Sequence, residues 1–229
     1  MARLKSNILG NLSGRLGNLS ARIIDGITHF VSRPSVFKIN RSPKAEAARK
    51  KFAVTVNFIT GILSVPELKY VWQKAGIKGK YLRSSMFKLN YHFFEGGSPT
   101  LLNIITPFGF TPAVKGLTIS EDNIDIELNP LNSLSNFLSV EVNLQIVLMT
   151  AFFNPINKFK ERLKVECMTK EINGFNFNMP YTFSFEIIDA VKAVSALYEN
   201  SIIYLAAITK NAAGKIVKCS STYAREVQL

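Results

Sequence analysis

The side chains that most often carry catalysis or bind metals are scarce in this 229-residue chain, which has 2 His and 2 Cys. His29 and His92 lie far apart in the sequence, neither cysteine has a neighbouring metal ligand, and no CxxC or HExxH motif occurs. Nucleophilic catalysis needs a base beside a serine or cysteine, and two histidines leave little material for one. We therefore predict no metal site, no cofactor and no catalytic residue, and hence a protein without enzyme activity.

Two motifs resemble ligand sites, but their residues predict ordinary secondary structure. The acidic cluster of residues 121–127 lacks the glycine and the twelfth-position glutamate of an EF-hand loop. Its Asp125 and Glu127 alternate with apolar residues, which predicts a strand with one acidic, solvent-facing side. The glycine-rich residues 10–17 lack the Gly-Lys-Ser/Thr ending of a phosphate-binding loop, so they predict turns.

The formal net charge of +12 is concentrated at the start of the chain. Residues 1–51 hold 11 bases and 2 acids, and the remaining residues hold 17 bases and 14 acids. Such an asymmetry favours an arm that meets an anionic partner, which is nucleic acid, a membrane surface or an acidic protein patch. The alternative is an arm that its charge merely keeps soluble. The candidate basic contacts are Arg15, Arg22, Arg33, Lys38, Arg41, Arg49, Lys50 and Lys51.

The same arm contains a short repeat, in which residues 9–15 and 16–22 share the pattern Leu-Gly-Asn-Leu-Ser-x-Arg. Gly and Asn tolerate positive φ and disfavour a helix, so the repeat predicts extended pieces joined by turns, or a hairpin. Asp25-Gly26 is a typical hairpin turn. The apolar residues of the arm, which cannot be buried within so short a segment, are Ile8, Leu9, Leu12, Leu16, Leu19, Ile23, Ile24 and Ile27.

These features together favour a structural, self-associating protein. We expect residues 1–31 to add as a strand to a sheet or groove of a neighbouring copy, because open sheet edges accept strands in this way. The basic residues would then face Asp125 and Glu127, and the helix face of residues 52–63 would carry further contacts. The chain would be the subunit of a homo-oligomer, filament, virion-like particle or surface assembly. The alternative is a nucleic-acid-associated binding protein that uses the basic arm, with contacts that do not depend on base sequence.

The middle of the chain predicts three helices. Ser42-Pro43 is a typical helix start, and Ala45, Ala48, Phe52, Val56, Ile59 and Leu63 follow at helical spacing. Further helices are predicted over residues 67–74, ended by Gly76, and over residues 82–94, ended by two glycines.

From about residue 115 the hydrophobic period changes to two, which predicts strands. The predicted strands cover residues 117–120, 124–128, 138–148, 163–168, 175–187, 202–209, 216–219 and 222–227. Turn signals, among them Asn154-Pro155, separate them. The predicted fold is α+β: a basic Gly/Asn-rich arm and connector (1–42), a helical module (43–112) and an immunoglobulin-like antiparallel β-sandwich (113–229).

Targeting signals and disulfides are not expected. Residues 6–22 lack the apolar core of a signal peptide, and no apolar run approaches the roughly 18 residues of a membrane span. This favours a virion or cytoplasmic location, with export by another route left open. Cys167 and Cys219 each follow an alternating pattern that directs them inward, which favours buried free thiols over a single disulfide.

Both ends of the chain resemble a family of uncharacterised proteins from Bacteroidota and their phages. Residues 8–17 resemble its opening GILGxxSGKxG motif, with Asn7 in place of the first glycine and Arg15 in place of the lysine. Arg33-Pro34 and residues 49–53 resemble its basic connector and first helix, and residues 204–223 resemble its closing strand pair. The resemblance implies the same order of elements and an association with phage-like or surface assemblies. It implies no catalytic residues, because the family is a domain of unknown function.

Overall fold

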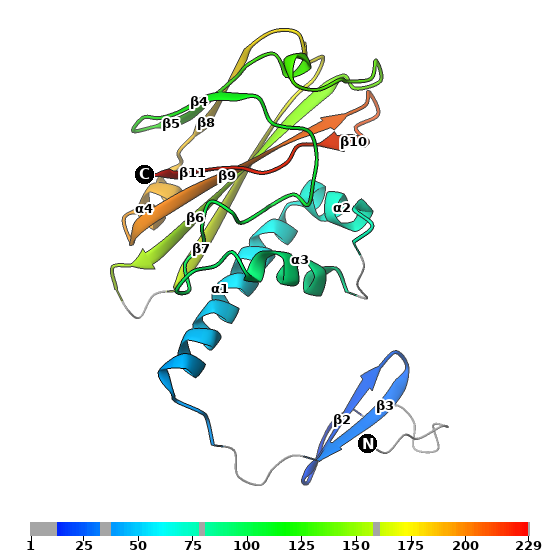
Figure 1. Cartoon of the computed structure of the whole chain (residues 1–229), viewed down its shortest axis with the longest axis vertical. Coiled ribbons are helices and arrows are strands. Elements are labelled where there is room, and N and C mark those ends of the chain that lie inside the picture. The colour runs from blue at the N-terminus through cyan, green and yellow to red at the C-terminus, as the bar shows by residue number, and fades with distance from the viewer. Residues whose placement is uncertain (1–12, 33–37, 78–80, 158–160, 229) are drawn as a thin grey trace. The chain divides into compact units, whose positions relative to one another are not determined.

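The fold is mixed α+β and mostly β, as the sequence predicts (Figure 1). A computed structural model describes residues 13–32, 38–77, 81–157 and 161–228. Within these ranges, four α-helices and eleven strands occur, and the strands form three antiparallel sheets. The chain divides into two units, Met1–Ala45 and Glu46–Leu229.

The first unit contains a three-stranded sheet, which we call the arm sheet. Strands β1 (Gly14–Leu16), β2 (Leu19–Ile24) and β3 (Ile27–Ser32) pair in the order β1-β2-β3. Asp25 and Gly26 have φ of 53° and 75°, the two positive values that a tight hairpin turn requires. The predicted turn at Asp25-Gly26 is confirmed.

Helix α1 (Pro43–Ser64) begins where the sequence predicts. The Ser42 hydroxyl accepts a hydrogen bond from the Ala45 N–H at 3.3 Å, which satisfies one of the free donors of the first turn. Helices α2 (Pro66–Lys74) and α3 (Leu82–Tyr91) follow. Gly76, just after α2, has a φ of 63°, typical of the residue that ends a helix.

The buried face of α1 differs from the predicted one. It consists of Val54, Thr55, Phe58, Ile59 and Ile62. Of the predicted stripe, Ile59 is fully buried, but Ala48 and Phe52 are exposed. Two apolar stripes run along this helix, and the sheet covers the one that carries Phe58. The predicted stripe is therefore confirmed at Ile59 and at Leu63, which packs against the core, and wrong at Ala48 and Phe52.

The second unit is built around a five-stranded sheet. Its path is β10 (Ile216–Cys219), β9 (Tyr198–Lys210), β6 (Asn143–Pro155) and β7 (Leu163–Ile172). Strand β11 (Tyr223–Val227) also pairs with β9, beyond the end of β10. The two central strands, β6 and β9, are each buried over at least ten consecutive residues, because both faces of this sheet are covered.

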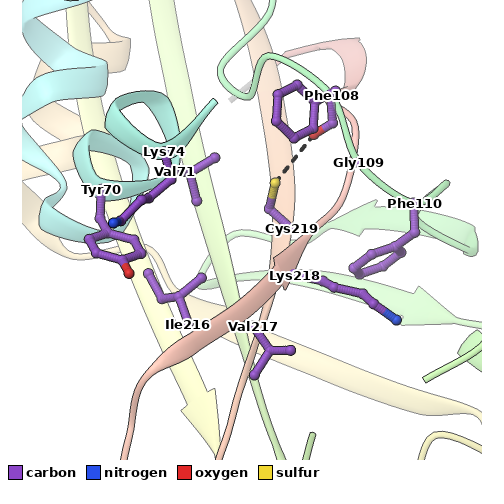
Figure 2. Close-up of a pocket in the computed structure, with 10 residues that line it drawn as sticks. All are labelled: Tyr70, Val71, Lys74, Phe108, Gly109, Phe110, Ile216, Val217, Lys218 and Cys219. Carbon is purple, nitrogen blue, oxygen red and sulfur yellow. Dashed lines mark hydrogen bonds between the residues drawn. The ribbon is translucent and has the colours of Figure 1, made fainter. Parts of the chain in front are cut away.

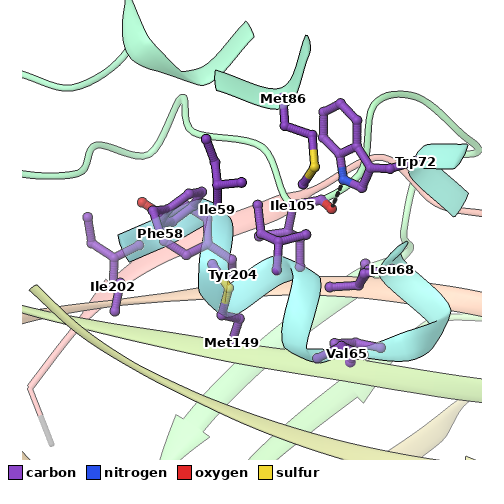
Figure 3. Packing of buried hydrophobic residues seen from close by; sticks show 14 of the residues in the cluster. Phe58, Ile59, Val65, Leu68, Trp72, Met86, Ile105, Met149, Ile202 and Tyr204 are labelled. Atoms are coloured by element: carbon purple, nitrogen blue, oxygen red, sulfur yellow. Dashed lines mark hydrogen bonds between the residues drawn. The ribbon is translucent and has the colours of Figure 1, made fainter. Parts of the chain in front are cut away.

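Helices cover one face of the sheet. Phe58 of α1 meets Phe94 and Tyr204 edge-to-face, with ring centroids 5.5 and 5.2 Å apart. Figure 3 shows Phe58 beside Tyr204. Trp72 of α2 donates a hydrogen bond to the Ile105 carbonyl at 2.8 Å. The helices therefore share a hydrophobic core with β6 and β9.

A second sheet covers the opposite face. Strands β4 (Val114–Ile119), β5 (Asn123–Leu128) and β8 (Tyr181–Glu186) pair in the order β4-β5-β8. Ile126 and Phe183 of this sheet pack with Ile146, Leu148 and other even-numbered residues of β6. The unit thus has three layers: helices, the five-stranded sheet and the three-stranded sheet.

Several predicted boundaries are wrong. The strand expected over residues 138–148 is β6, which starts at Asn143 and continues through the predicted Asn154-Pro155 turn. Of residues 175–187, only Tyr181–Glu186 form a strand, because Phe175 and Phe177 lie in a loop and are buried in the core between the sheets. Helix α4 (Asp189–Ser195) and the short 3₁₀ turn Leu131–Ser133 were not predicted.

Candidate functional site

One face of the arm sheet is apolar. The register pairs Ala21 with Phe30 and Ile23 with Thr28, and cross-strand partners share a face. Leu19 and Ile23 are 40% and 41% exposed on this face, whereas Ala21 and Thr28 are buried between them. The hydroxyl of Thr28 has no hydrogen-bond partner within the described part of the chain. We call Leu19, Ala21, Ile23, Thr28 and Phe30 the apolar arm face.

The opposite face of the arm sheet is mixed. Arg15 pairs with Ser20, which places it on the same face as Arg22. Ile24, Ile27 and Val31 are also exposed on this side. The structure therefore separates the predicted arm residues into the apolar arm face and a mixed face that carries Arg15 and Arg22, which we call the basic arm face. The sequence pattern alone did not assign this division.

Ile8, Leu9, Leu12 and Arg33 lie outside the described residues. Leu16 is placed by its backbone pairing with Leu19 alone. Lys38 and Arg41 are exposed in the segment before α1.

The other predicted basic contacts lie on α1. Arg49 is exposed, and Lys50 and Lys51 are half-buried. The Lys51 ammonium lies over the ring of Tyr91 on α3, 4.7 Å from its centroid, in a cation–π contact. Figure 1 shows α3 beside α1, so the basic run adjoins aromatic residues that come later in the chain.

The predicted acidic counterparts share the outer face of the β4-β5-β8 sheet. Ile124, Ile126 and Leu128 of β5 point into the core, which turns Asp125 and Glu127 outward. Glu127 forms an ion pair of 3.0 Å with Lys115, in which both side chains are substantially exposed. Sequence reasoning did not anticipate Lys115, because a bulge in β4 brings it beside Glu127.

Both cysteines are free thiols, as predicted. Burial raises the pKa of Cys167 and of Cys219 from 9.0 to about 11. The Cys219 thiol donates to the Phe108 carbonyl at 3.2 Å. Both thiols are therefore protonated at neutral pH, and neither has the lowered pKa of a catalytic nucleophile.

A cavity of about 460 Å³ lies between α2, residues 108–110 and β10 (Figure 2). Tyr70 and Lys74 line one wall, Phe108 and Phe110 another, and Cys219 is among the β10 residues. Its lining is mainly apolar and contains no acid–base pair, so it suits binding more than catalysis. Sequence reasoning missed this cavity, because it forms only when residues 108–110 pack against a strand about a hundred positions later.

Gly109 allows residues 108–110 to lie close to strand β10. A Cβ at Gly109 would lie 2.0 Å from the carbonyl oxygen of Cys219, and its φ is 149°. The next N–H, that of Phe110, donates to the same oxygen at 3.1 Å. One wall of the cavity therefore depends on the absence of a side chain at Gly109.

A buried lysine joins three elements near this cavity. Lys210 of β9, whose side chain is 9% exposed, contacts Glu171 of β7 at 2.7 Å and Glu67 of α2 at 3.5 Å. Both carboxylates stabilise the ammonium, which would otherwise be costly to bury. This network ties α2 to the five-stranded sheet.

No cluster of three or more His, Cys, Asp or Glu residues in the described ranges could hold a metal ion. Among the helices that the structure describes, none is long and apolar enough to cross a membrane.

Comparisons with known proteins add no functional assignment. No family model matches the sequence, and no curated protein matches it. Two structures of the β-glucosidase from Kluyveromyces marxianus, one in complex with glucose, align with 62% and 65% of this chain at 11% identity. The TM-scores are 0.21 and 0.19, and the aligned region spans 16% and 20% of the enzyme chains. Likeness at this level supports neither a shared fold nor a shared activity.

Proposed function

We propose that the chain is a non-enzymatic structural protein that self-assembles through its arm sheet. The observation that carries the proposal is the small three-stranded arm sheet, on whose apolar face Leu19 and Ile23 remain about two-fifths exposed. A sheet with an apolar face is stable when a second layer covers that face. A second copy supplies such a layer, because the same face is present on every molecule.

The energetics favour association of two apolar arm faces. Covering Leu19 and Ile23, each about two-fifths exposed, contributes roughly 1 kcal/mol for each side chain. The edge strand β3 adds backbone donors and acceptors for strand addition by a neighbour. Burial of apolar area resists salt, so pairing through the apolar arm face persists when the ionic strength is raised.

The basic arm face fits the acidic outer face of the β4-β5-β8 sheet of another copy. Arg15 and Arg22 are diagonal neighbours across β1 and β2, which separates their Cα atoms by roughly 7 Å. Asp125 and Glu127 are two positions apart on β5, also roughly 7 Å. An arm that pairs by one face and docks by the other extends an assembly beyond a dimer.

We also propose that the two packed sheets form an immunoglobulin-like sandwich.

The alternative function is nucleic-acid binding by the arm, which the shared face of Arg15 and Arg22 supports. The dependence on salt concentration distinguishes self-assembly from nucleic-acid binding. Phosphate contacts weaken steeply between 50 and 200 mM salt, whereas apolar association persists.

The test is the mass of the full-length protein by size-exclusion chromatography with light scattering, and negative-stain microscopy. The double variant Leu19→Lys/Ile23→Lys should remove the apolar association, so that the protein becomes monomeric at high salt concentration, where the charged contact is screened. Ile156→Lys, at a residue that is 65% exposed in the second unit, is the matched control and should assemble normally. A monomeric wild type at high concentration, or an arm variant that assembles as the wild type does, would refute the proposal.

A charge exchange tests the docking of the basic face. Arg15→Glu/Arg22→Glu and Asp125→Arg/Glu127→Arg should each shorten the assemblies, and the combination of all four changes should restore them. If the variant with all four changes assembles as poorly as either double variant, the contact is contradicted.

A further inference from the structure

An aromatic cluster lies on the surface between α1 and α3. Phe52 and Phe87 have ring centroids 5.0 Å apart, and Phe87 and Tyr91 are stacked at 5.0 Å with an interplanar angle of 22°. Phe52 is 56% exposed, and the other two rings are half-buried. The α1 residues that pack on the five-stranded sheet lie on another face of this helix, so Phe52 is not needed there.

Positive charge lies beside these rings. The Lys51 ammonium lies over Tyr91 at 4.7 Å, and the exposed Lys88 follows Phe87 on α3, one turn before Tyr91. Together α1 and α3 contain six bases and one acid, which is Glu46 in the first turn of α1. The surface therefore attracts anions and presents ring faces beside them.

We propose that this surface, defined by Lys51, Phe52, Phe87, Lys88 and Tyr91, binds single-stranded nucleic acid. A base would stack on the exposed Phe52 ring, and phosphates would meet Lys51 and Lys88. The site differs from the basic arm face, and the inference does not rest on the assembly proposal.

The chemistry of the surface favours a single strand over other anions. A duplex hides the faces of its bases, and an acidic peptide would leave the rings without stacking partners. Stacking tolerates every base, so binding should show little sequence preference. Two lysine–phosphate contacts predict a slope of roughly −1.4 for the logarithm of the affinity against the logarithm of the salt concentration.

The test is fluorescence anisotropy of the full-length protein with labelled oligo-dT and oligo-rU of 20 nucleotides, between 50 and 300 mM NaCl. Phe52→Ala should weaken binding about 5- to 100-fold, because base–aromatic stacking is lost. Phe108→Ala is the matched control, since Phe108 is also 56% exposed but lies outside this surface. Phe52→Trp should retain binding, which separates stacking from folding effects.

The charge contribution is tested separately. Lys51→Gln and Lys88→Gln should each reduce the salt slope by roughly 0.7, and Lys69→Gln on the exposed side of α2 should leave it unchanged.

Four outcomes would overturn the proposal. They are no binding at 50 mM NaCl, wild-type affinity of Phe52→Ala, equal binding of a 20-base-pair duplex, and equal competition by poly-glutamate at matched charge. The last would assign the surface to an acidic protein. A loss of binding in Arg15→Gln/Arg22→Gln but not in Phe52→Ala would assign nucleic acid to the arm.

Discussion

Replacing Gly61 by alanine tests whether helices and sheet form one packed unit. An ideal Cβ at Gly61 of α1 would lie 2.5 Å from Cγ1 and 3.0 Å from Cβ of Val165 on β7. Real Cβ contacts are essentially never closer than 3.0 Å, so α1 or the Val165 side chain must move. The thiol of Cys167 also donates to the Gly61 carbonyl at 3.6 Å, which restricts movement of the helix at this point.

Two opposing terms set the size of the effect. Alanine gains about 1 kcal/mol over glycine in a helix interior. Overpacking in a well-packed core costs about 1–3 kcal/mol. We therefore expect Gly61→Ala to lower the free energy of unfolding by about 0–2 kcal/mol. In the Val165→Ala background the Cγ clash is absent, so the same change should be at least about 1 kcal/mol more favourable.

The assay is urea unfolding followed by two probes. Fluorescence of Trp72, which is buried in the helix–sheet core, reports on the helices, and far-ultraviolet circular dichroism reports on the strands as well. Both signals should give the same transition midpoint. Gly116→Ala is the control, because a Cβ there has no contact closer than 3.8 Å. Two results together would refute the packing argument. Gly61→Ala would raise the free energy of unfolding by the full amount of about 1 kcal/mol, and the change would be the same in the Val165→Ala background.

Three further perturbations follow from the same contacts. Gly109→Ala places a Cβ against the Cys219 carbonyl at a positive φ, so it should cost about 3 kcal/mol or more in urea unfolding, and wild-type stability would contradict this. The unfolded thiols of Cys167 and Cys219 lose their protons at a lower pH than the folded ones, so their contribution to stability is full below pH 9.0 and is lost as the pH rises to about 11. Thermal unfolding measured between pH 9.0 and about 11 should show this decline in stability. Replacement of both cysteines by alanine should make the stability less dependent on pH. An equal decline without the cysteines would show that the two thiols do not cause it. Lys210→Met leaves the Glu171 carboxylate without its closest cation, so it should lower the free energy of unfolding by about 3 kcal/mol. Adding Glu171→Leu should recover most of this loss. No recovery in the double variant would contradict the pairing.

The local elements were predictable because their signals lie within a few residues. Ser42-Pro43 marks the start of α1 through a cap and a fixed φ, and Asp25-Gly26 marks a turn that requires two positive φ values. The alternation around Asp125 and Glu127 likewise placed both carboxylates on one face of β5. Each of these features depends on backbone geometry over one turn or one hairpin.

Features that depend on distant partners were not predictable. The stripe of α1 that faces the sheet is chosen by β6 and β9, so Phe52 turned out to be exposed and Phe58 buried. Residues 175–178 alternate aromatic and polar residues as a strand does, yet they form a loop. Phe175 is held there by a hydrogen bond from its N–H to the Val142 carbonyl and by burial between the sheets. Propensity cannot distinguish such a loop from a strand, because both bury aromatic side chains.

The sequence by itself determined the basic arm, the three helices that precede the strands of the two packed sheets, and the scarcity of chemically reactive residues. Composition and short-range periodicity carry these properties. Only the tertiary structure decided which surfaces those residues share. It placed the later Phe87 and Tyr91 beside Phe52, separated the arm into apolar and basic faces, and closed a cavity with Gly109 against β10. Such contacts join positions that are far apart in the chain, so their free energy depends on the packing of the whole unit and not on any local pattern.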